Sequence, residues 1–193
     1  MTVLNITNRL IISVMQRKKK MNKRKRLISK GENALSKQEL SFIESRDSLF
    51  MASVGKDGWP YVQHRGGPRG FIKIINSTSF GFADYSGNRQ YISVGNIQYS
   101  DKVCLFLIDY PTQQRLKIWA TAKISDVNEN PDLFSKLSVP DYDAVVERLI
   151  SFKVQAFDWN CPQHITPRYT GEEIRHGVNN KDRNILKYCR GDI

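Results

Sequence analysis

Residues 60–96, PYVQHRGGPRGFIKIINSTSFGFADYSGNRQYISVGN, decide the fold and hold the first candidate site. They contain two β-type runs joined by short turns of glycine, serine and asparagine. The runs bring the cations Arg65, Lys73 and Arg89 around these turns. A phosphate group needs fixed cations and exposed donors, and glycine lets a ligand approach the backbone closely. The stretch therefore predicts a site for a phosphate-bearing ligand. Its further donors are Ser86, Gly87 and Asn88.

The chain on either side of this stretch continues the β pattern. Asp57 and Gly58 can adopt the positive φ that a tight hairpin needs, which predicts strands at residues 49–54 and 59–66. Further strands are expected at residues 70–75, 79–85, 102–110 and 115–124. Six strands in a row, with few helical patterns between them, predict a mostly β (α+β) fold. An antiparallel barrel is favoured over a doubly wound sheet.

Helical patterns flank these strands. Ser36 and Glu39 form a capping box, so ordered structure is expected to begin near Ser36. Residues 89–101 have mixed helical spacing and are expected to cover one end of the barrel.

The segment after the sixth strand is predicted to hold two helices and a further strand. Residues 130–137 and 141–149 carry apolar residues three and four positions apart, after Asp or Pro. Residues 149–159 alternate in character, as a half-buried strand does. The predicted buried face is Ile150, Phe152, Val154 and Ala156.

The net charge of +11 lies almost entirely at the N-terminus. Residues 1–30 hold ten Lys or Arg residues and no acid, which leaves twenty basic and nineteen acidic residues in the rest. The basic cluster alone could bind nucleic acid or an anionic membrane, but the nearly neutral body argues against specific nucleic-acid binding. We interpret residues 1–30 as a basic, disordered extension, or as an upstream reading-frame extension ahead of Met15 or Met21. Residues 36–193 are interpreted as one domain with a C-terminal loop and helix extension.

Neither export nor a metal site is indicated. The apolar run at residues 10–15 is too short to span a bilayer, and its charges follow it rather than precede it. Cys104, Cys161 and Cys189 form no CxxC pair, which argues against a disulfide framework and a zinc site. A cytoplasmic protein with no transmembrane segment is expected.

Four parts of the chain together resemble the FMN-binding split barrel of the pyridoxamine 5'-phosphate oxidase-like proteins. They are PYVQHRGGPRGFIKII, GFADYSGNRQ, NIQYSDKVCLFLIDY and RLKIWATAKI, and the resemblance covers roughly residues 36–158. The block AFDWNCPQHITPRYT resembles one found in a flavin-binding branch rather than in the vitamin B6 oxidases themselves. The resemblance implies a homodimer of six-stranded antiparallel split β-barrels with flanking helices, holding FMN in clefts between the subunits.

The resemblance also assigns cofactor contacts. Arg65, Lys73, Ser86 and Arg89 would hold the FMN phosphate, with Asn88 in the same turn. Backbone amides of Gly66 and Gly67 would meet the isoalloxazine edge, and Arg115 or Lys117 would face the ring. A cation there stabilises the reduced flavin. The alternatives are that Arg65 and Arg89 are ordinary surface cations and that Lys73 and Arg115 are edge residues with exposed charges.

Two neighbouring side chains are open to different interpretations. His64 alternates with Arg65 along the strand, so it is interpreted as a packed or hydrogen-bonded residue rather than a base. Asp84 is expected to cap the turn that follows it, and the alternative is a hydrogen bond to the ribityl chain.

The loop after residue 158 holds the substrate-side candidates Trp159, His164 and Arg168. Pro162 and Pro167 restrict its backbone, so it could hold an aromatic face and a donor over a flavin. The alternative is that Trp159 closes a barrel end while His164 donates to backbone carbonyls.

These features favour an FMN-dependent oxidoreductase that moves a hydride or electrons between a small organic or nicotinamide donor and an acceptor. The alternative is a non-catalytic FMN- or haem-binding carrier or sensor, because one fold hosts both. Paired carboxylates, a Ser/His/Asp arrangement and a Walker loop are absent from the sequence, so hydrolase and NTPase functions have no support.

Overall fold

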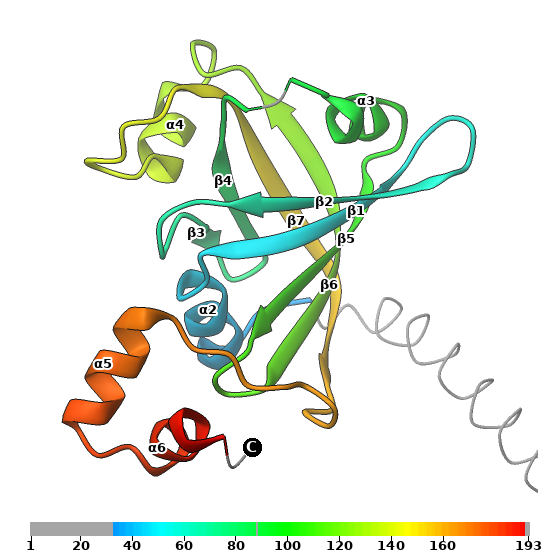
Figure 1. Ribbon diagram of the computed structural model, residues 1–193. Helices are drawn as coiled ribbons and strands as arrows, with labels where there is room; N and C mark the ends of the chain where they lie inside the picture. The colour runs from blue at the N-terminus through cyan, green and yellow to red at the C-terminus, as the bar shows by residue number, and fades with distance from the viewer. Residues whose placement is uncertain (1–32, 88, 192–193) are drawn as a thin grey trace, which may run out of the picture. The chain divides into compact units, whose positions relative to one another are not determined.

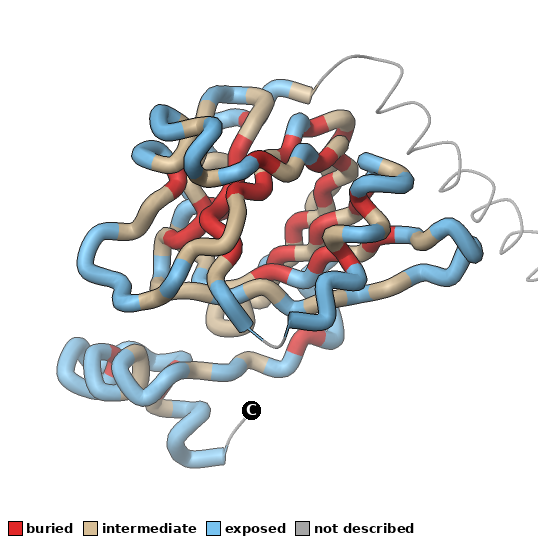
Figure 2. The backbone as a smooth tube through the Cα atoms, turned by 90° about the horizontal axis from the view of Figure 1, so that it is seen from above, coloured by how far each residue is buried: buried red, intermediate tan, exposed pale blue. Residues whose placement is uncertain are grey.

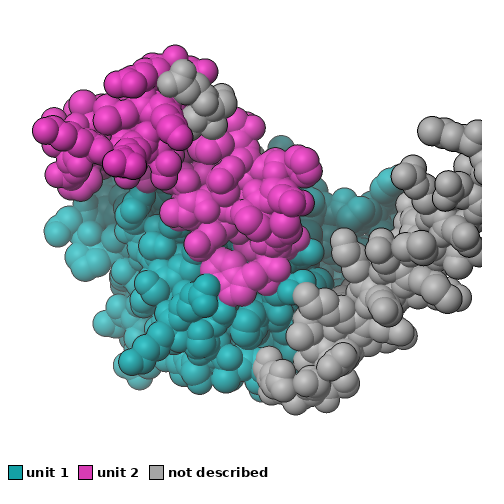
Figure 3. All heavy atoms as spheres, turned by 90° about the horizontal axis from the view of Figure 1, so that it is seen from below, with its two compact units in different colours: residues 1–107, 116–158 teal, residues 108–115, 159–193 magenta. Residues whose placement is uncertain are grey.

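A computed structural model describes residues 33–87 and 89–191 of the chain (Figure 1). The proposed extension at residues 1–30 and the site candidate Asn88 lie outside these ranges. The chain divides into two compact units, shown in different colours in Figure 3. The first runs to Leu107 and includes Leu116–Asp158, and the second joins Ile108–Arg115 to Trp159–Ile193.

The described residues form a seven-stranded sheet and flanking helices (Figure 1). In chain order the elements are α2 (Lys37–Glu44), β1 (Ser48–Val54), β2 (Pro60–Gly66), β3 (Lys73–Asn76), β4 (Ser79–Tyr85), α3 (Ile92–Tyr99), β5 (Lys102–Asp109), β6 (Gln114–Ser125), α4 (Pro131–Leu137), β7 (Val146–Asn160), α5 (Gly171–Asn179) and α6 (Arg183–Arg190). The strand order is β2-β1-β5-β6-β7-β4-β3. The predicted antiparallel fold class is confirmed, but the barrel has seven strands rather than six because β7 pairs with β4.

The hairpin and the helix start expected at the beginning of the domain are both present. Strands β1 and β2 pair antiparallel from Ser48 opposite Gly66 to Val54 opposite Pro60, and Gly58 in their turn has φ 81°. The Ser36 backbone donates to the Glu39 carboxylate at 2.9 Å, which completes the capping box of α2. The local chemistry of turns and caps therefore places these elements.

The neighbouring strands β4 and β7 contribute buried residues to the core of the first unit. The four apolar residues predicted on one face of β7 are each at most 1% exposed: Ile150, Phe152, Val154 and Ala156. The Phe152 ring packs 5.3 Å from that of Phe80 and 5.6 Å from that of Phe82, measured between centroids. In Figure 2 buried positions are red, and along parts of the tube they alternate with less buried ones. Burying a Val, Ile or Phe side chain of this set contributes about 1.5–3 kcal/mol to folding.

The helix predicted at residues 141–149 is wrong. Its second half is the start of β7, where Leu149 lies opposite Ala83 and Arg148 lies opposite Asp84 on β4. Leu149 and Ala83 are buried together with Leu137 of α4. Pairing with β4 satisfies the backbone of this segment and buries its apolar residues, so tertiary context outweighs the local helical spacing.

The second unit contains α5 and α6, which continue the predicted C-terminal extension. Thr170 caps α5 with a second capping box, and Asp182 caps α6. The two helices approach closely, since a Cβ added at Gly177 would lie 2.1 Å from Cδ1 of Ile185. The rings of Tyr169 and Tyr188 meet edge to face at 5.0 Å.

Two further expectations concern membranes and cysteines. No helix among the described residues is long and apolar enough to cross a bilayer. Cys104, Cys161 and Cys189 form no disulfide within the described part of the chain.

Candidate functional site

A cavity of about 400 Å³ opens in the first unit between β2, β4, the turn after β4, the start of α3 and the start of β7. This volume lies in the range of small-molecule sites. Its aromatic lining is Phe71, Phe82, Tyr85, Tyr91 and Tyr142, and its charged lining is Arg65, Asp84, Arg89, Glu147 and Arg148. We call it the β2–β4 cavity.

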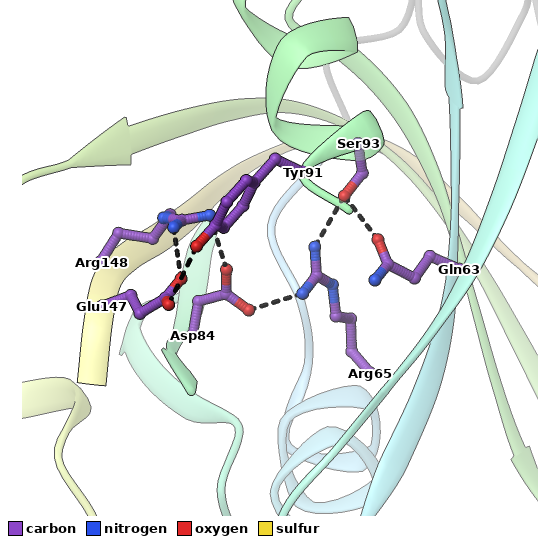
Figure 4. Close-up of polar contacts among 7 residues, drawn as sticks. All are labelled: Gln63, Arg65, Asp84, Tyr91, Ser93, Glu147 and Arg148. Carbon is purple, nitrogen blue, oxygen red and sulfur yellow. Dashed lines mark hydrogen bonds and ion pairs between the residues drawn. The ribbon is translucent and has the colours of Figure 1, made fainter. Parts of the chain in front are cut away.

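A chain of hydrogen bonds crosses one wall of the cavity (Figure 4). Alternation along β2 puts Gln63 and Arg65 on the same half-buried face. Nη1 of Arg65 lies 2.6 Å from Oδ1 of Asp84, and Nη2 donates to Oγ of Ser93 at 2.6 Å. Ser93 in turn donates to Oε1 of Gln63 at 2.7 Å. These contacts tie β2 to β4 and to the first turn of α3.

A second group of side chains adjoins this chain at Asp84. Arg148 lies opposite Asp84 in the β4–β7 register, and its Nη1 is 3.5 Å from Oδ2 of Asp84. Arg148 also pairs with Glu147 and stacks over the Tyr91 ring, 4.6 Å from its centroid. The Tyr91 hydroxyl donates to Glu147 at 3.1 Å. Figure 4 shows these three side chains gathered beside the carboxylate of Asp84.

The charge of Asp84 is set by opposing effects. Burial raises the pKa of its carboxyl above the ordinary 3.8, Arg65 and Arg148 lower it, and Glu147 raises it. Burial is the largest of these, so the folded state holds the proton of Asp84 more tightly than the unfolded chain does. With guanidinium groups on both oxygens, we take the carboxylate as ionised near neutral pH.

Two buried polar atoms at the cavity have no hydrogen-bond partner among the described residues: Nε of Arg65 and the hydroxyl of Tyr85. Burial also raises the pKa of the Tyr85 hydroxyl, and the Tyr85 ring packs against that of Tyr142 at 4.9 Å. An unsatisfied buried donor costs about 1–3 kcal/mol, so such atoms often mark the place of a missing partner.

Arg65, Arg89 and Arg148 line the cavity. Arg65 and Arg148 each contact a carboxylate. Arg89 forms no ion pair within the described part of the chain. Its backbone has φ 56°, and that of Tyr91 has φ 52°. Left-handed backbone at a residue other than glycine costs about 1–3 kcal/mol and is enriched at functional sites. The turn is anchored where the Ser86 amide donates to the Val145 carbonyl at 2.8 Å.

Six of the residues predicted from sequence line this cavity together: Arg65, Gly66, Asp84, Ser86, Gly87 and Arg89. Asp84 was expected to cap the turn that follows it. Its carboxylate instead contacts Arg65 and Arg148, and no amide of the described part of that turn donates to it. His64 lies at the cavity edge with its ring 5.5 Å from that of Phe50, which agrees with a packing role.

Three other candidates in the first unit lie elsewhere. Lys73 pairs with Gly81 between β3 and β4, and it does not line the cavity. The Gly67 amide donates to the Asp47 carbonyl at 3.0 Å. Lys117 stacks over Trp119, with Nζ 5.7 Å from the ring centroid.

The remaining candidates belong to the second unit: Arg115, Trp159, His164 and Arg168. Arg115 donates to the carbonyl of Cys161, the guanidinium of Arg168 lies 4.8 Å from the centre of the Tyr110 ring, and His164 has φ 63°. Arg115 thus holds the loop at Cys161 through a hydrogen bond within the second unit.

Sequence reasoning missed Ser93, which does not line the cavity but hydrogen-bonds to Arg65 and Gln63. It also missed several lining residues: Gln63, Tyr85, Tyr91, Glu147 and Arg148. Gln63 carried a usable signal, because it lies two positions before Arg65 on the same strand face. Glu147 and Arg148 were missed because the sequence predicted a helix at residues 141–149, where the structure has the start of β7.

The sequence and structure were compared with known proteins. The family model for pyridoxamine 5'-phosphate oxidase matches residues 35–156. Curated proteins gave no match to this sequence. Among solved structures, HupZ from Group A Streptococcus has a TM-score of 0.48 and 13% identity, over 70% of this chain and 100% of that one. A candidate pyridoxamine 5'-phosphate oxidase from Lactobacillus delbrueckii has a TM-score of 0.48 and 18% identity, over 65% and 94%. An FMN-binding protein from Syntrophomonas wolfei has a TM-score of 0.44 and 14% identity, over 79% and 97%.

The family match spans more than half of the chain and contains every residue that lines the β2–β4 cavity. It begins before α2 and ends within β7, so it covers the sheet and the helices packed on it. The chain belongs to the pyridoxamine 5'-phosphate oxidase family.

Proposed function

We propose that the protein binds FMN in the β2–β4 cavity and acts as a flavin-dependent oxidoreductase. The observation that carries the proposal is the lining itself: a cavity of single-ligand size that joins aromatic faces to Arg89, a cation without an ion pair among the described residues. A phosphorylated aromatic cofactor matches both features. Membership of the pyridoxamine 5'-phosphate oxidase family supports the same assignment.

The phosphate end of the ligand is assigned to the turn after β4. Arg89 supplies a charge that no carboxylate among the described residues neutralises, and Ser86 and Gly87 lie beside it on the lining. Arg65 is a weaker phosphate candidate than its sequence position implies, because Asp84 compensates its charge at 2.6 Å. We therefore place Arg89 first among the residues that would hold the phosphate.

The aromatic end of the ligand is assigned to the ring-lined part of the cavity. Phe71, Phe82 and Tyr91 would cover a flat ring system and exclude water from it. FMN bound there would supply the hydride and electron chemistry, while these side chains orient the ring. The donor and acceptor would be a small organic or nicotinamide compound and a second small molecule.

A flavin carrier without turnover is a second candidate, favoured by one observation. The charged groups on the lining are largely paired with one another: Asp84 with Arg65 and Arg148, and Glu147 with Arg148. Paired groups have less freedom to move a proton to or from a substrate. Turnover with a reduced nicotinamide would separate the oxidoreductase from the carrier.

We also propose that the protein is a homodimer. Strand β2 lies at one end of the strand order and exposes apolar side chains, with Val62 at 60% and the adjoining Trp59 at 75%. An edge strand with exposed apolar residues favours pairing with a second chain. Such an interface would be two-fold and self-complementary.

The test is a titration of the purified protein with FMN and with riboflavin, followed by flavin fluorescence. The two ligands share a ring, so their difference reports on the phosphate. We expect Arg89→Gln to weaken FMN binding about tenfold or more, which corresponds to one charge-assisted contact, and riboflavin binding much less. Lys123→Gln removes the same charge from an exposed position on β6 and serves as the matched control.

The outcomes separate the proposals. Absence of binding of either flavin by the wild type would overturn the flavin assignment, and a Soret band in the purified protein would favour haem. Equal losses of FMN and riboflavin in Arg89→Gln would remove Arg89 from the phosphate site.

A further inference from the structure

Gln63 points a free amide group at the β2–β4 cavity. Its oxygen accepts the hydrogen bond from Ser93 at 2.7 Å, and its nitrogen has no partner among the described residues. Gln63 itself lines the cavity, and Figure 4 shows its side chain beside Arg65 and Ser93. Sequence reasoning assigned this residue no role, so its chemistry is additional to the contacts proposed above.

Ser93 determines which end of the amide faces the ligand. Ser93 is fully buried, and its oxygen already accepts a hydrogen bond from Arg65 at 2.6 Å. Its single hydrogen therefore needs an acceptor, and the Gln63 oxygen is the one that the described residues provide. If the amide were turned over, two donors would face the serine oxygen and the buried hydroxyl would lose its acceptor.

Arg65 sets the direction of the hydrogen bonds along the whole chain. A guanidinium group can only donate, so Arg65 donates to Asp84 at one end and to Ser93 at the other. Ser93 passes one hydrogen on to Gln63, whose remaining groups are two N–H donors. Asp84 and Ser93 are thus positioning residues, and they act on the cavity through the orientation of Arg65 and Gln63.

We propose that Gln63 is a specificity-determining residue that donates to an uncharged acceptor edge, a carbonyl oxygen or a ring nitrogen, of a planar ligand. The inference rests on the proposed flavin function, in which that edge belongs to the isoalloxazine ring. A neutral amide beside a compensated arginine suits such an edge better than a phosphate, whereas Arg89 keeps the anionic end. Gln63 would thus contact the uncharged edge of the ligand, and Arg89 would contact its anionic end.

The experiment measures dissociation constants for FMN and riboflavin in Gln63→Glu, which keeps the shape of the side chain but replaces its donors by a carboxylate. We expect both constants to rise by about tenfold or more and by the same factor, because both ligands carry the ring. Gln38→Glu introduces the same charge on an exposed position of α2, outside the lining of the β2–β4 cavity, and should change both constants less than twofold.

A second variant guards against misfolding or a charge artefact. Ser93→Ala adds no charge and releases the Gln63 amide to rotate, so we expect a smaller loss that is again equal for the two ligands. Circular dichroism melting checks that each variant is folded. If Gln63→Glu does not fold, the dissociation constants of Ser93→Ala for FMN and riboflavin test the role of Gln63 instead.

The outcomes distinguish this inference from the proposed function. A wild type that binds neither flavin defeats the function and the inference together. A wild type that binds both flavins, with constants unchanged in Gln63→Glu or in Ser93→Ala, overturns the role of Gln63 alone. A loss confined to FMN would place Gln63 at the phosphate and overturn the inference as well.

Discussion

Replacing Asp84 by Asn tests the balance of burial and charge at the cavity. The substitution keeps an oxygen that can accept from Arg65 but removes the negative charge. The side chains of Asp84 and Arg65 are only 6% and 14% exposed, so solvent screens their interaction little. A hydrogen bond to a charged group is worth about 1.5–3 kcal/mol, and a neutral one about 0.5–1.5 kcal/mol. Because burial disfavours the charge, its removal offsets part of the weaker hydrogen bond. We therefore expect Asp84→Asn to lower the free energy of unfolding by less than about 1 kcal/mol near pH 7.

The difference in free energy of unfolding between the wild type and Asp84→Asn should change with pH in one direction. Burial raises the pKa of Asp84 in the folded state above its ordinary 3.8, so the folded chain binds this proton more tightly. The stability that this proton contributes is fully present below the unfolded pKa and is lost as the pH rises through the folded pKa. Asn does not titrate. The stability advantage of the wild type over Asp84→Asn should therefore grow between about pH 7 and about pH 4.

The assay is urea unfolding followed by tryptophan fluorescence at both pH values, with m-values compared to confirm the same transition. Asp143→Asn, at an exposed position in the segment before β7, is the matched control and should change stability by about 0.5 kcal/mol or less. An advantage of the wild type that shrinks on acidification would refute the reasoning. It would mean that Arg65 and Arg148 outweigh burial and depress the pKa of Asp84.

Three further predictions concern other parts of the chain. Sedimentation velocity should find a dimer, and Val62→Glu on the β2 edge should yield monomers, whereas a monomeric wild type would contradict the proposed assembly. Gly177→Ala should destabilise the second unit by about 1–3 kcal/mol because its Cβ would overlap Ile185, measured by thermal melting against Gly171→Ala, where the added Cβ has space. Deleting residues 1–30 should leave flavin affinity unchanged and abolish any salt-sensitive binding to anionic vesicles or nucleic acid, and loss of flavin would contradict it.

Local signals in the sequence accounted for most of the fold. Alternation predicted the buried face of β7, positive φ at Gly58 closed the first hairpin, and Ser36 with Glu39 capped α2. The helix expected at residues 141–149 failed for a non-local reason. Its apolar spacing fits a helix or a strand, and the choice is made by β4, which lies more than fifty residues earlier in the chain.

The candidate site could be predicted only in part for the same reason. The sequence identified cations and turns, and the structure brings Arg65 and Arg89 to one cavity. The sequence alone could not reveal that Asp84, nineteen residues after Arg65, compensates the charge of Arg65. Nor could it reveal that Ser93, twenty-eight residues after Arg65, accepts a hydrogen bond from the other nitrogen of that guanidinium. Which cation stays unpaired depends on such contacts across the fold.

The central claim is that the β2–β4 cavity is the flavin site, and a crystal structure of the protein grown with excess FMN tests it most directly. The account predicts density for the isoalloxazine ring among Phe71, Phe82 and Tyr91, with the phosphate at the turn that holds Arg89. An empty β2–β4 cavity at saturating FMN, or a flavin bound elsewhere on the chain, would contradict it.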